Sequence, residues 1–248
     1  MIVIPMAGLS RRFREAGYDR PKYMLDLNGR SLFAHAVESF RSAFDREPFL
    51  FIARDEAGTA DFVSAETRRL GIGDAGIVIV DAPTRGQADT VRLGLDAVAT
   101  PADTPITVFN IDTFRPGYAP PAASWMATAD GYLEVMFGAD PGFSFISPVD
   151  GGLAEGRVAE TAEKQVISDL ASTGLYWFRR ADDFRDAFER AASSTVDGEL
   201  YIAPLYNDLI ARGRDIRFNR VPAQQVIFCG TPDQYLALGG ADADTTRG

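Results

Sequence analysis

The sequence has very little of two residues on which many catalytic and metal sites depend. Cys229 is its single cysteine and His35 its single histidine among 248 residues. One cysteine excludes an internal disulfide and fits a reducing compartment, so we expect a cytoplasmic protein. One histidine excludes metal sites built from several histidines and disfavours acid–base catalysis by histidine.

Long apolar runs and an excess of positive charge are also missing. No apolar run approaches the length that spans a bilayer, and no basic segment precedes the short apolar stretch near the N-terminus. We therefore expect neither a membrane span nor a signal peptide. Asp and Glu number 35 against 25 Lys and Arg, a net charge of −10. This balance argues against nucleic acid and membrane surfaces as partners, whereas small anionic ligands need only local positive charge.

The first half of the chain alternates short apolar segments with amphipathic ones. The apolar segments predict buried strands at 2–4, 49–52, 77–80 and 106–109. Helices are predicted between them, capped by Ser31 and extending to Phe44, then at 56–70 and 88–98. Strands that alternate with helices in this way indicate a mostly parallel sheet covered on both sides.

The pattern changes after a loop rich in Pro and Gly at 115–121. Strands without long helices between them are predicted at 132–137, 143–146, 157–161 and 174–178, which suggests an added mixed or antiparallel section. Helices at 181–192, 204–213 and 232–238 and short strands at 216–221 and 226–228 follow. We find no internal repeat and no long linker, so we expect a single domain over 1–240 and a flexible tail over 241–248.

The segment most informative about chemistry is 7–13, directly after the first strand. Ligands of parallel sheets bind beyond the carboxyl ends of the strands. Gly8 allows backbone N–H groups to approach phosphate oxygens closely, and Arg12 and Lys22 add cationic donors. The same residues also suit a plain strand–helix turn with basic side chains on the surface, so both interpretations stay open on composition alone.

Several segments stand in the order found in the sugar-phosphate nucleotidyltransferases, and over about residues 1–238 the chain resembles that family. The matching segments are 4–13, 21–25, 27–30, 86–90, 109–112, 163–164, 172–176 and 198–200. The nearest resemblance is to proteins of capsule and surface-polysaccharide synthesis. It implies a Rossmann-like, glycosyltransferase-A-like α/β fold with a mixed, mostly parallel sheet and helices on both faces.

The family's reaction is attack by the phosphate of a sugar 1-phosphate, or a similar metabolite, on the α-phosphorus of a nucleoside triphosphate. Pyrophosphate leaves, and Mg²⁺ is the implied cofactor. Such a reaction asks the protein mainly to align two anions and offset their charge. A chain with one histidine and no evident Ser-His or Cys-His pair suits this demand. A non-sugar acceptor such as phosphocholine stays open.

The resemblance assigns the nucleotide side residue by residue. Arg12 would contact the β- and γ-phosphates, and Lys22 would bridge the α-phosphate and the attacking phosphate. The implied nucleotide-binding residues are Ala7, Gly8, Leu9, Ser10, Arg11, Gly86, Gln87 and Ala88. The Gln87 amide can pair with uracil, thymine or cytosine, which modestly favours a pyrimidine. Asp112 is the implied Mg²⁺ ligand. Gln87 also fits as an ordinary first residue of a helix, and Asp112 as a turn aspartate.

The acceptor side follows from later segments. Lys164 would bind the acceptor phosphate, and Glu163 would bond sugar hydroxyls. Thr173 and Gly174 would form the turn beneath the sugar, and Glu199 would be a second hydroxyl acceptor. A solvated Glu-Lys pair and a carboxylate in the first turn of a helix are the plain structural alternatives.

Three positions depart from the family pattern. Ser10 replaces the second glycine of the phosphate loop, and Arg11 replaces the usual Thr or Ser. Phe228 stands where the family's second metal carboxylate usually lies, which puts a fully protein-liganded metal site in doubt. Cys229 beside it is expected to be a buried apolar thiol.

Two other functions remain open. One is a non-catalytic protein that binds nucleotides or nucleotide sugars and has a degenerate metal site. The other is a glycosyltransferase of similar topology, which would more often show an Asp-x-Asp pair than Asn110-Ile111-Asp112. The presence of Arg12, Lys22 and Lys164 together favours the nucleotidyltransferase. No apolar stripe indicates an oligomeric state.

Overall fold

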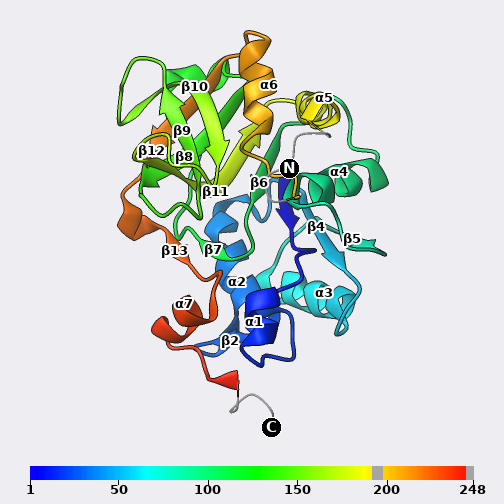
Figure 1. The fold of residues 1–248 in the computed structure, drawn as a ribbon. Helices are drawn as coiled ribbons and strands as arrows, with labels where there is room; N and C mark the ends of the chain where they lie inside the picture. The colour runs from blue at the N-terminus through cyan, green and yellow to red at the C-terminus, as the bar shows by residue number, and fades with distance from the viewer. Residues whose placement is uncertain (192–197, 244–248) are drawn as a thin grey trace.

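Figure 1 shows the computed structural model, which describes residues 1–191 and 198–243. Its first half contains four parallel strands in the spatial order β5-β4-β1-β6. They are β1 (Ile2–Pro5), β4 (Phe49–Arg54), β5 (Ala75–Val80) and β6 (Ile106–Phe109). Each coincides with a predicted strand, because continuous apolar runs suit strands covered on both faces.

Helices cover both faces of this parallel section. Side chains of α1 (Arg11–Glu15), α2 (Leu32–Val37) and α3 (Thr59–Leu70) share one hydrophobic cluster. Those of α4 (Gln87–Ala97), α5 (Ala181–Ala191) and α6 (Leu205–Ala211) share the cluster on the other face. The mixed α/β, Rossmann-like class with helices on both faces is therefore confirmed.

The helix predicted from Ser31 to Phe44 differs in detail from the structure. Ser31 caps α2 as predicted, since its Oγ accepts a hydrogen bond from Ala34 N at 3.1 Å. The helix predicted to extend to Phe44 is interrupted, because η2 (Glu38–Ala43) contains Phe40 with non-helical angles of φ −102° and ψ 27°. The predicted helix over 181–192 is confirmed over Ala181–Ala191, and residue 192 lies outside the described residues.

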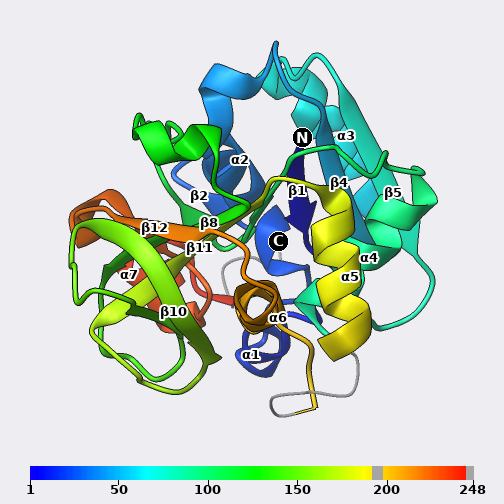
Figure 2. The same cartoon turned by 90° about the horizontal axis from the view of Figure 1, so that it is seen from above.

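The second half continues the same sheet with mostly antiparallel pairs, in the order β6-β11-β8-β12-β10-β9. The strands are β8 (Gly131–Phe137), β9 (Ser144–Pro148), β10 (Glu155–Glu163), β11 (Leu170–Phe178) and β12 (Ile216–Arg220). Only β8 and β12 pair in parallel within this group. β9 also pairs with β11, so these five strands curl into a ring, opposite β4 and β5 in Figure 2.

Several short strands and 3-10 helices connect the main elements. η1 (Lys22–Met24) and the short pair β2 (Asp26–Leu27) and β3 (Arg30–Ser31) follow α1, and η3 (Ser124–Ala127) precedes β8. β7 (Thr113–Phe114) pairs with β13 (Ile227–Phe228), which follows η4 (Ala223–Gln225).

α7 (Pro232–Ala237) then packs beside α1 (Figure 1). It begins with a capping box of Thr231 and Gln234. The rings of Phe13, Tyr18 and Tyr235 meet edge to face between the two helices. Tyr18 also donates a hydrogen bond to the Ala241 carbonyl at 3.0 Å, and residues 244–248 of the predicted tail lie outside the described residues. In the part of the chain that is described, no helix has the length and apolarity to cross a membrane.

Candidate functional site

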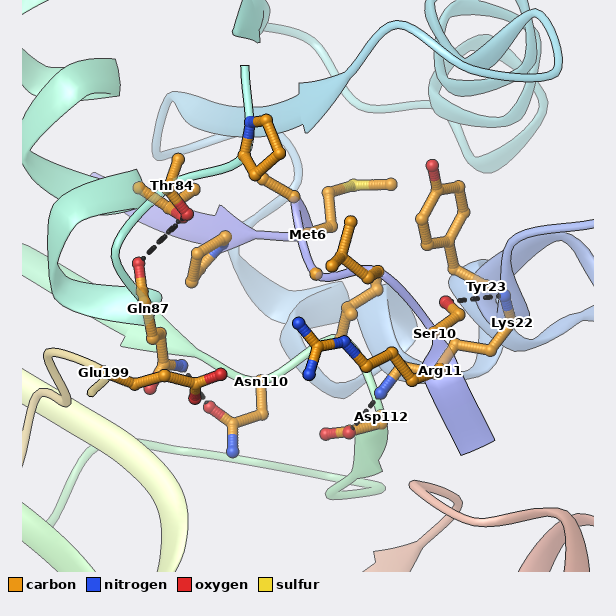
Figure 3. A pocket seen from close by; sticks show the side chains of 18 of the residues that line it. Met6, Ser10, Arg11, Lys22, Tyr23, Thr84, Gln87, Asn110, Asp112 and Glu199 are labelled. Carbon is orange, nitrogen blue, oxygen red and sulfur yellow. Dashed lines mark hydrogen bonds and ion pairs between the residues drawn. The ribbon is translucent and has the colours of Figure 1, made fainter. Parts of the chain in front are cut away.

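Two adjoining cavities open where β1, β5 and β6 end, at the carboxyl edge of the parallel strands. Their volumes are about 430 and 450 Å³. The residues following all three strands line the first cavity, which we call the loop cavity (Figure 3). Residues of β9, β10 and β11 line the second, which we call the sheet cavity. Four residues line both: Gln87, Asn110, Asp112 and Tyr201.

The loop after β1 is held in an unusual backbone conformation. Ser10 has φ 50°, in the left-handed region that favours glycine. Its carbonyl accepts the Arg14 N–H at 3.0 Å, and its Oγ accepts the Lys22 N–H at 3.3 Å. The departure from glycine at this position thus brings a side-chain contact with the segment that carries Lys22. Ala7, Gly8, Leu9, Ser10 and Arg11 all line the loop cavity.

Lys22 and Asp112 form an ion pair where the two cavities meet. Lys22 Nζ lies 2.5 Å from Asp112 Oδ2, with the side chains 20% and 28% exposed. Burial raises the pKa of Asp112, but the charge and hydrogen bond of Lys22 outweigh burial and keep that pKa below its ordinary value. Asp112 is therefore ionised near neutral pH. Arg12 is exposed and lines the sheet cavity, whereas Arg11 lines the loop cavity.

The loop after β5 packs directly on a distant backbone segment. Gly86 has φ 126°, and a Cβ built there would lie 2.5 Å from the Leu200 carbonyl oxygen. Ala88 N donates to that carbonyl at 3.0 Å, and Leu200 N donates to Arg85 O at 2.6 Å. Because only glycine permits this approach, the predicted segments at 86–88 and 198–200 lie side by side. Ala88 is fully buried and lines neither cavity.

A bulge in β11 forms the floor of the sheet cavity. Ser172 pairs with Val135 and Tyr176 with Leu133, so three residues of β11 stand opposite Glu134 alone. The Thr173 hydroxyl donates to Glu134 Oε1 at 3.1 Å and is buried, so it points into the protein interior. Gly174 follows with φ 89° and faces Asn110.

Glu134 also forms a buried ion pair. Arg115 Nε donates to Glu134 Oε1 at 3.0 Å, and the two side chains are 8% and 2% exposed. Burial raises the pKa of Glu134, although Arg115 and Thr173 oppose the shift. This pair anchors the bulge from behind.

A second group of side chains lines the wall of the sheet cavity. Ser144 Oγ donates to Glu163 and contacts Tyr176 Oη at 3.2 Å. Burial raises the pKa of Glu163. Lys164 adopts φ 54° and places Nζ 4.9 Å from the centre of the Tyr201 ring.

Tyr201 connects this wall to Glu199. Its hydroxyl donates to Glu199 Oε2 at 2.6 Å, and burial raises the pKa of Tyr201. Glu199 itself lines the loop cavity rather than the sheet cavity, unlike Glu163 and Lys164.

The segment with the departing phenylalanine lies beside Asp112. Cys229 N donates to Asp112 O at 2.8 Å. Phe228, the residue before Cys229, therefore lies close to the segment that carries Asp112. The Phe228 ring packs on Phe143 with centroids 4.9 Å apart and lines the sheet cavity. Cys229 is buried, and burial raises the pKa of its thiol to about 12, as expected for an inert apolar thiol.

The site can accommodate a divalent cation next to Asp112. A Cβ built on Gly230 would lie 3.1 Å from Asp112 Oδ2, so the glycine keeps space beside the carboxylate. Over residues 1–191 and 198–243 no group of three or more His, Cys, Asp or Glu could hold a metal alone. Mg²⁺ often takes one or two carboxylates and completes its shell with phosphate oxygens and water, which these residues fit.

Every residue that the sequence implicated, apart from Ala88, lines one of the two cavities. Sequence reasoning gave no role to Asn110, Ser144, Tyr176, Tyr201 or the pair Arg115–Glu134. Asn110 and Tyr176 lie within matching segments, which was the available signal. Tyr201 lies two residues from Glu199, but nothing local indicates that its ring contacts Lys164.

Comparisons with known proteins show the family and the fold. The model of the MobA-like NTP transferase domain matches residues 2–132. A nucleoside-diphosphate-sugar pyrophosphorylase from Vibrio cholerae RC9 is 47% identical, with 96% of this chain and 99% of that chain covered and a TM-score of 0.89. No curated protein matches the sequence.

Two more distant structures share the fold. An inositol-1-phosphate CTP transferase from T. maritima is 13% identical, with 96% and 94% of the two chains covered and a TM-score of 0.71. A UTP-bound UGPase from Acinetobacter baumannii is 15% identical, with 96% and 90% covered and a TM-score of 0.71.

Proposed function

The chain belongs to the MobA-like NTP transferase family and is a nucleotidyltransferase of the sugar-pyrophosphorylase type, and we propose that it acts on a sugar 1-phosphate or a similar phosphorylated metabolite. In the proposed reaction an oxygen of the acceptor phosphate attacks the α-phosphorus of a nucleoside triphosphate. A new P–O–P bond forms, the α–β bridge breaks, and pyrophosphate leaves. A nucleotide sugar is the product.

The observation that carries this proposal is the ion pair of Lys22, which lines the loop cavity, with Asp112, which lines both cavities. A nucleotide in the loop cavity and an acceptor in the sheet cavity would bring their phosphates together at Lys22 and Asp112. The Nζ atom of Lys22 lies 2.5 Å from Oδ2 of Asp112. Lys22 would bridge both phosphates and offset the charge that develops between them. Arg12 lines the sheet cavity, so it would contact the β- and γ-phosphates where the two cavities meet.

The nucleotide would be held mainly by the loop cavity. We propose that Ala7, Gly8, Leu9, Ser10 and Arg11 bind it with Gly86 and Gln87, a pyrimidine being modestly favoured. Ala88 would act through its backbone hydrogen bond to Leu200 rather than by contact with the base.

The acceptor would be held in the sheet cavity. Lys164 would bind its phosphate, and Glu163 would accept hydrogen bonds from hydroxyls. Gly174 would lie beneath the acceptor, and buried Thr173 would support it through Glu134. Glu199 faces the loop cavity, so we propose that it reaches the acceptor only where the two cavities meet.

Mg²⁺ is the proposed cofactor, with Asp112 as its protein ligand. When bound, the ion would offset phosphate charge during transfer. Asp112→Asn should then lose most metal-dependent activity, whereas Phe228→Asp should lower the Mg²⁺ concentration needed for half activity. Undiminished Mg²⁺-dependent pyrophosphate release in Asp112→Asn would reject this site.

We also propose that residues 1–240 form one domain that acts in the cytoplasm to supply an activated sugar for surface polysaccharide. The similarity to a nucleoside-diphosphate-sugar pyrophosphorylase and the single buried cysteine support this placement. No nucleic acid or membrane partner is required by it.

The test is pyrophosphate release from each nucleoside triphosphate, with Mg²⁺ and a panel of sugar 1-phosphates and phosphocholine. Reactions without acceptor serve as controls. Release that depends on one acceptor supports the proposal. Nucleotide binding without release for any acceptor would favour a non-catalytic binding protein, and transfer from a nucleotide sugar to a hydroxyl would favour a glycosyltransferase.

A further inference from the structure

Asn110 occupies the junction of the two cavities and has no role in the proposed reaction. It is the first residue after β6 and lines both cavities. Figure 3 shows its side chain in the loop cavity, joined to Gln87 by a dashed line. Its backbone N–H donates to the Gly174 carbonyl at 3.3 Å, and its carbonyl accepts from Thr113 N at 3.3 Å. The backbone of Asn110 is therefore fixed between β6, the β11 bulge and β7.

The Asn110 side chain is held by residues from both cavities. From the nucleotide side, Gln87 Nε2 donates to Asn110 Oδ1 at 2.5 Å. From the acceptor side, Gly174 leaves the space that the amide fills, because a Cβ built on Gly174 would lie 2.5 Å from Asn110 Nδ2. A contact that close cannot exist, so any side chain at 174 would displace Asn110.

The bond to Asn110 determines which atoms Gln87 offers to a ligand. Gln87 begins α4 directly after the Gly86 loop, so its backbone is fixed by the packing on Leu200. Among the described residues only Asn110 bonds the Gln87 amide, so the Oε1 acceptor remains available. An amide has an oxygen that accepts and a nitrogen that donates, and turning it over exchanges the two.

We propose that Asn110 is a positioning residue for base selection, holding the Gln87 amide in one orientation, and that Gly174 makes this possible from the acceptor turn. The inference rests on the proposed function, because it takes Gln87 to face the nucleotide base. Without Asn110 the amide would turn freely and offer either hydrogen-bonding pattern to the base edge. Base preference would then fall even though Gln87 is unchanged.

The test measures nucleotide binding alone, without any acceptor. UTP, CTP, TTP, GTP and ATP are titrated calorimetrically with Mg²⁺ onto wild type, Asn110→Ala and Asn110→Asp. The readout is the ratio of dissociation constants between the tightest base and the next. Asn110→Ala should reduce that ratio roughly five- to tenfold, as expected for the loss of one oriented hydrogen bond.

Asn110→Asp separates orientation from general damage. Its carboxylate still accepts from Gln87 Nε2, so the base ratio should stay near the wild-type value. All triphosphates should bind more weakly, since a negative charge is added beside them. Gln225→Ala, an exposed glutamine in η4, is the matched control and should change neither ratio nor affinity.

Gly174→Ala extends the test to the acceptor turn and should lower the base ratio as Asn110→Ala does. A ratio unchanged in Asn110→Ala, with wild type still selective, overturns the role of Asn110 and leaves the proposed function intact. A ratio unchanged only in a folded Gly174→Ala overturns the part played by Gly174. Failure of wild type to bind any of the five triphosphates would instead overturn the proposed function, and this inference with it.

Discussion

The two cavities are built by different means, although they share four residues. The loop cavity depends on backbone conformation, with Ser10 and Gly86 at positive φ in loops that follow parallel strands. The sheet cavity depends on buried side chains at the β11 bulge, such as Glu134 and Thr173. Substitutions in the loop cavity should therefore alter function with little loss of stability, whereas those behind the sheet cavity should alter both.

The largest effect is expected at Glu134, where a substitution should lower stability. Glu134→Ala would leave Arg115 buried without its partner, so the free energy of unfolding should fall by about 3–5 kcal/mol. Chemical denaturation measures the change. The double variant Arg115→Met/Glu134→Leu removes both charges and should recover most of the loss. Equal stability of Glu134→Ala and wild type would show that the ion pair does not anchor the β11 bulge.

Lys22→Ala should have the next largest effect, on turnover rather than on stability. Loss of a donor aimed at developing charge should lower turnover at least about a hundredfold. Lys22 is only partly buried, so the thermal midpoint should change little. Lys22→Arg keeps the charge and tests whether geometry also matters. Wild-type turnover in a folded Lys22→Ala would remove the assignment.

Smaller effects are expected from Lys164→Ala and Gln87→Ala, each on the binding of a different substrate. The first should weaken acceptor binding roughly tenfold and the second should weaken nucleotide binding and relax base preference, since each loses one polar contact. Separate titrations of each ligand onto each variant measure the division. If Lys164→Ala chiefly impairs nucleotide affinity, the two cavities do not divide the substrates as proposed.

The smallest effect is expected at Ser10. Ser10→Gly and Ser10→Ala both lose the Oγ contact with the Lys22 N–H, but only alanine keeps a Cβ in the left-handed conformation. The glycine variant should therefore be more stable than the alanine variant by about 1 kcal/mol. Thermal unfolding compares them directly. Equal stability would mean that the loop moves to another conformation when Oγ is absent.

The sequence predicted the parallel half of the fold well, because strands covered on both faces leave continuous apolar runs such as 49–52. It could not predict that β12 inserts between β8 and β10, since strand order depends on contacts distant in the chain. The break at Phe40 was missed because the apolar spacing on either side of it still fits one helix.

The matching segments contained most of the residues that line the two cavities, but not the residues that pack behind them. Glu134 lies within an apolar strand, where its charge gave no indication of a partner at Arg115. The sequence also could not predict that Glu199 lines the loop cavity, because this depends on the close approach of Gly86 and Leu200. Short motifs therefore indicate which residues line the cavities, whereas packing between distant segments decides how those residues are positioned.

The two lysines have a further consequence for labelling experiments. Lys22 lines the loop cavity and Lys164 the sheet cavity, and every other basic side chain apart from His35 is an arginine. A reagent that acylates amines therefore has only two side-chain targets, one for each cavity, and acylation removes their charge. Mass spectrometry of the acylated peptides would report, lysine by lysine, which cavity a bound ligand shields.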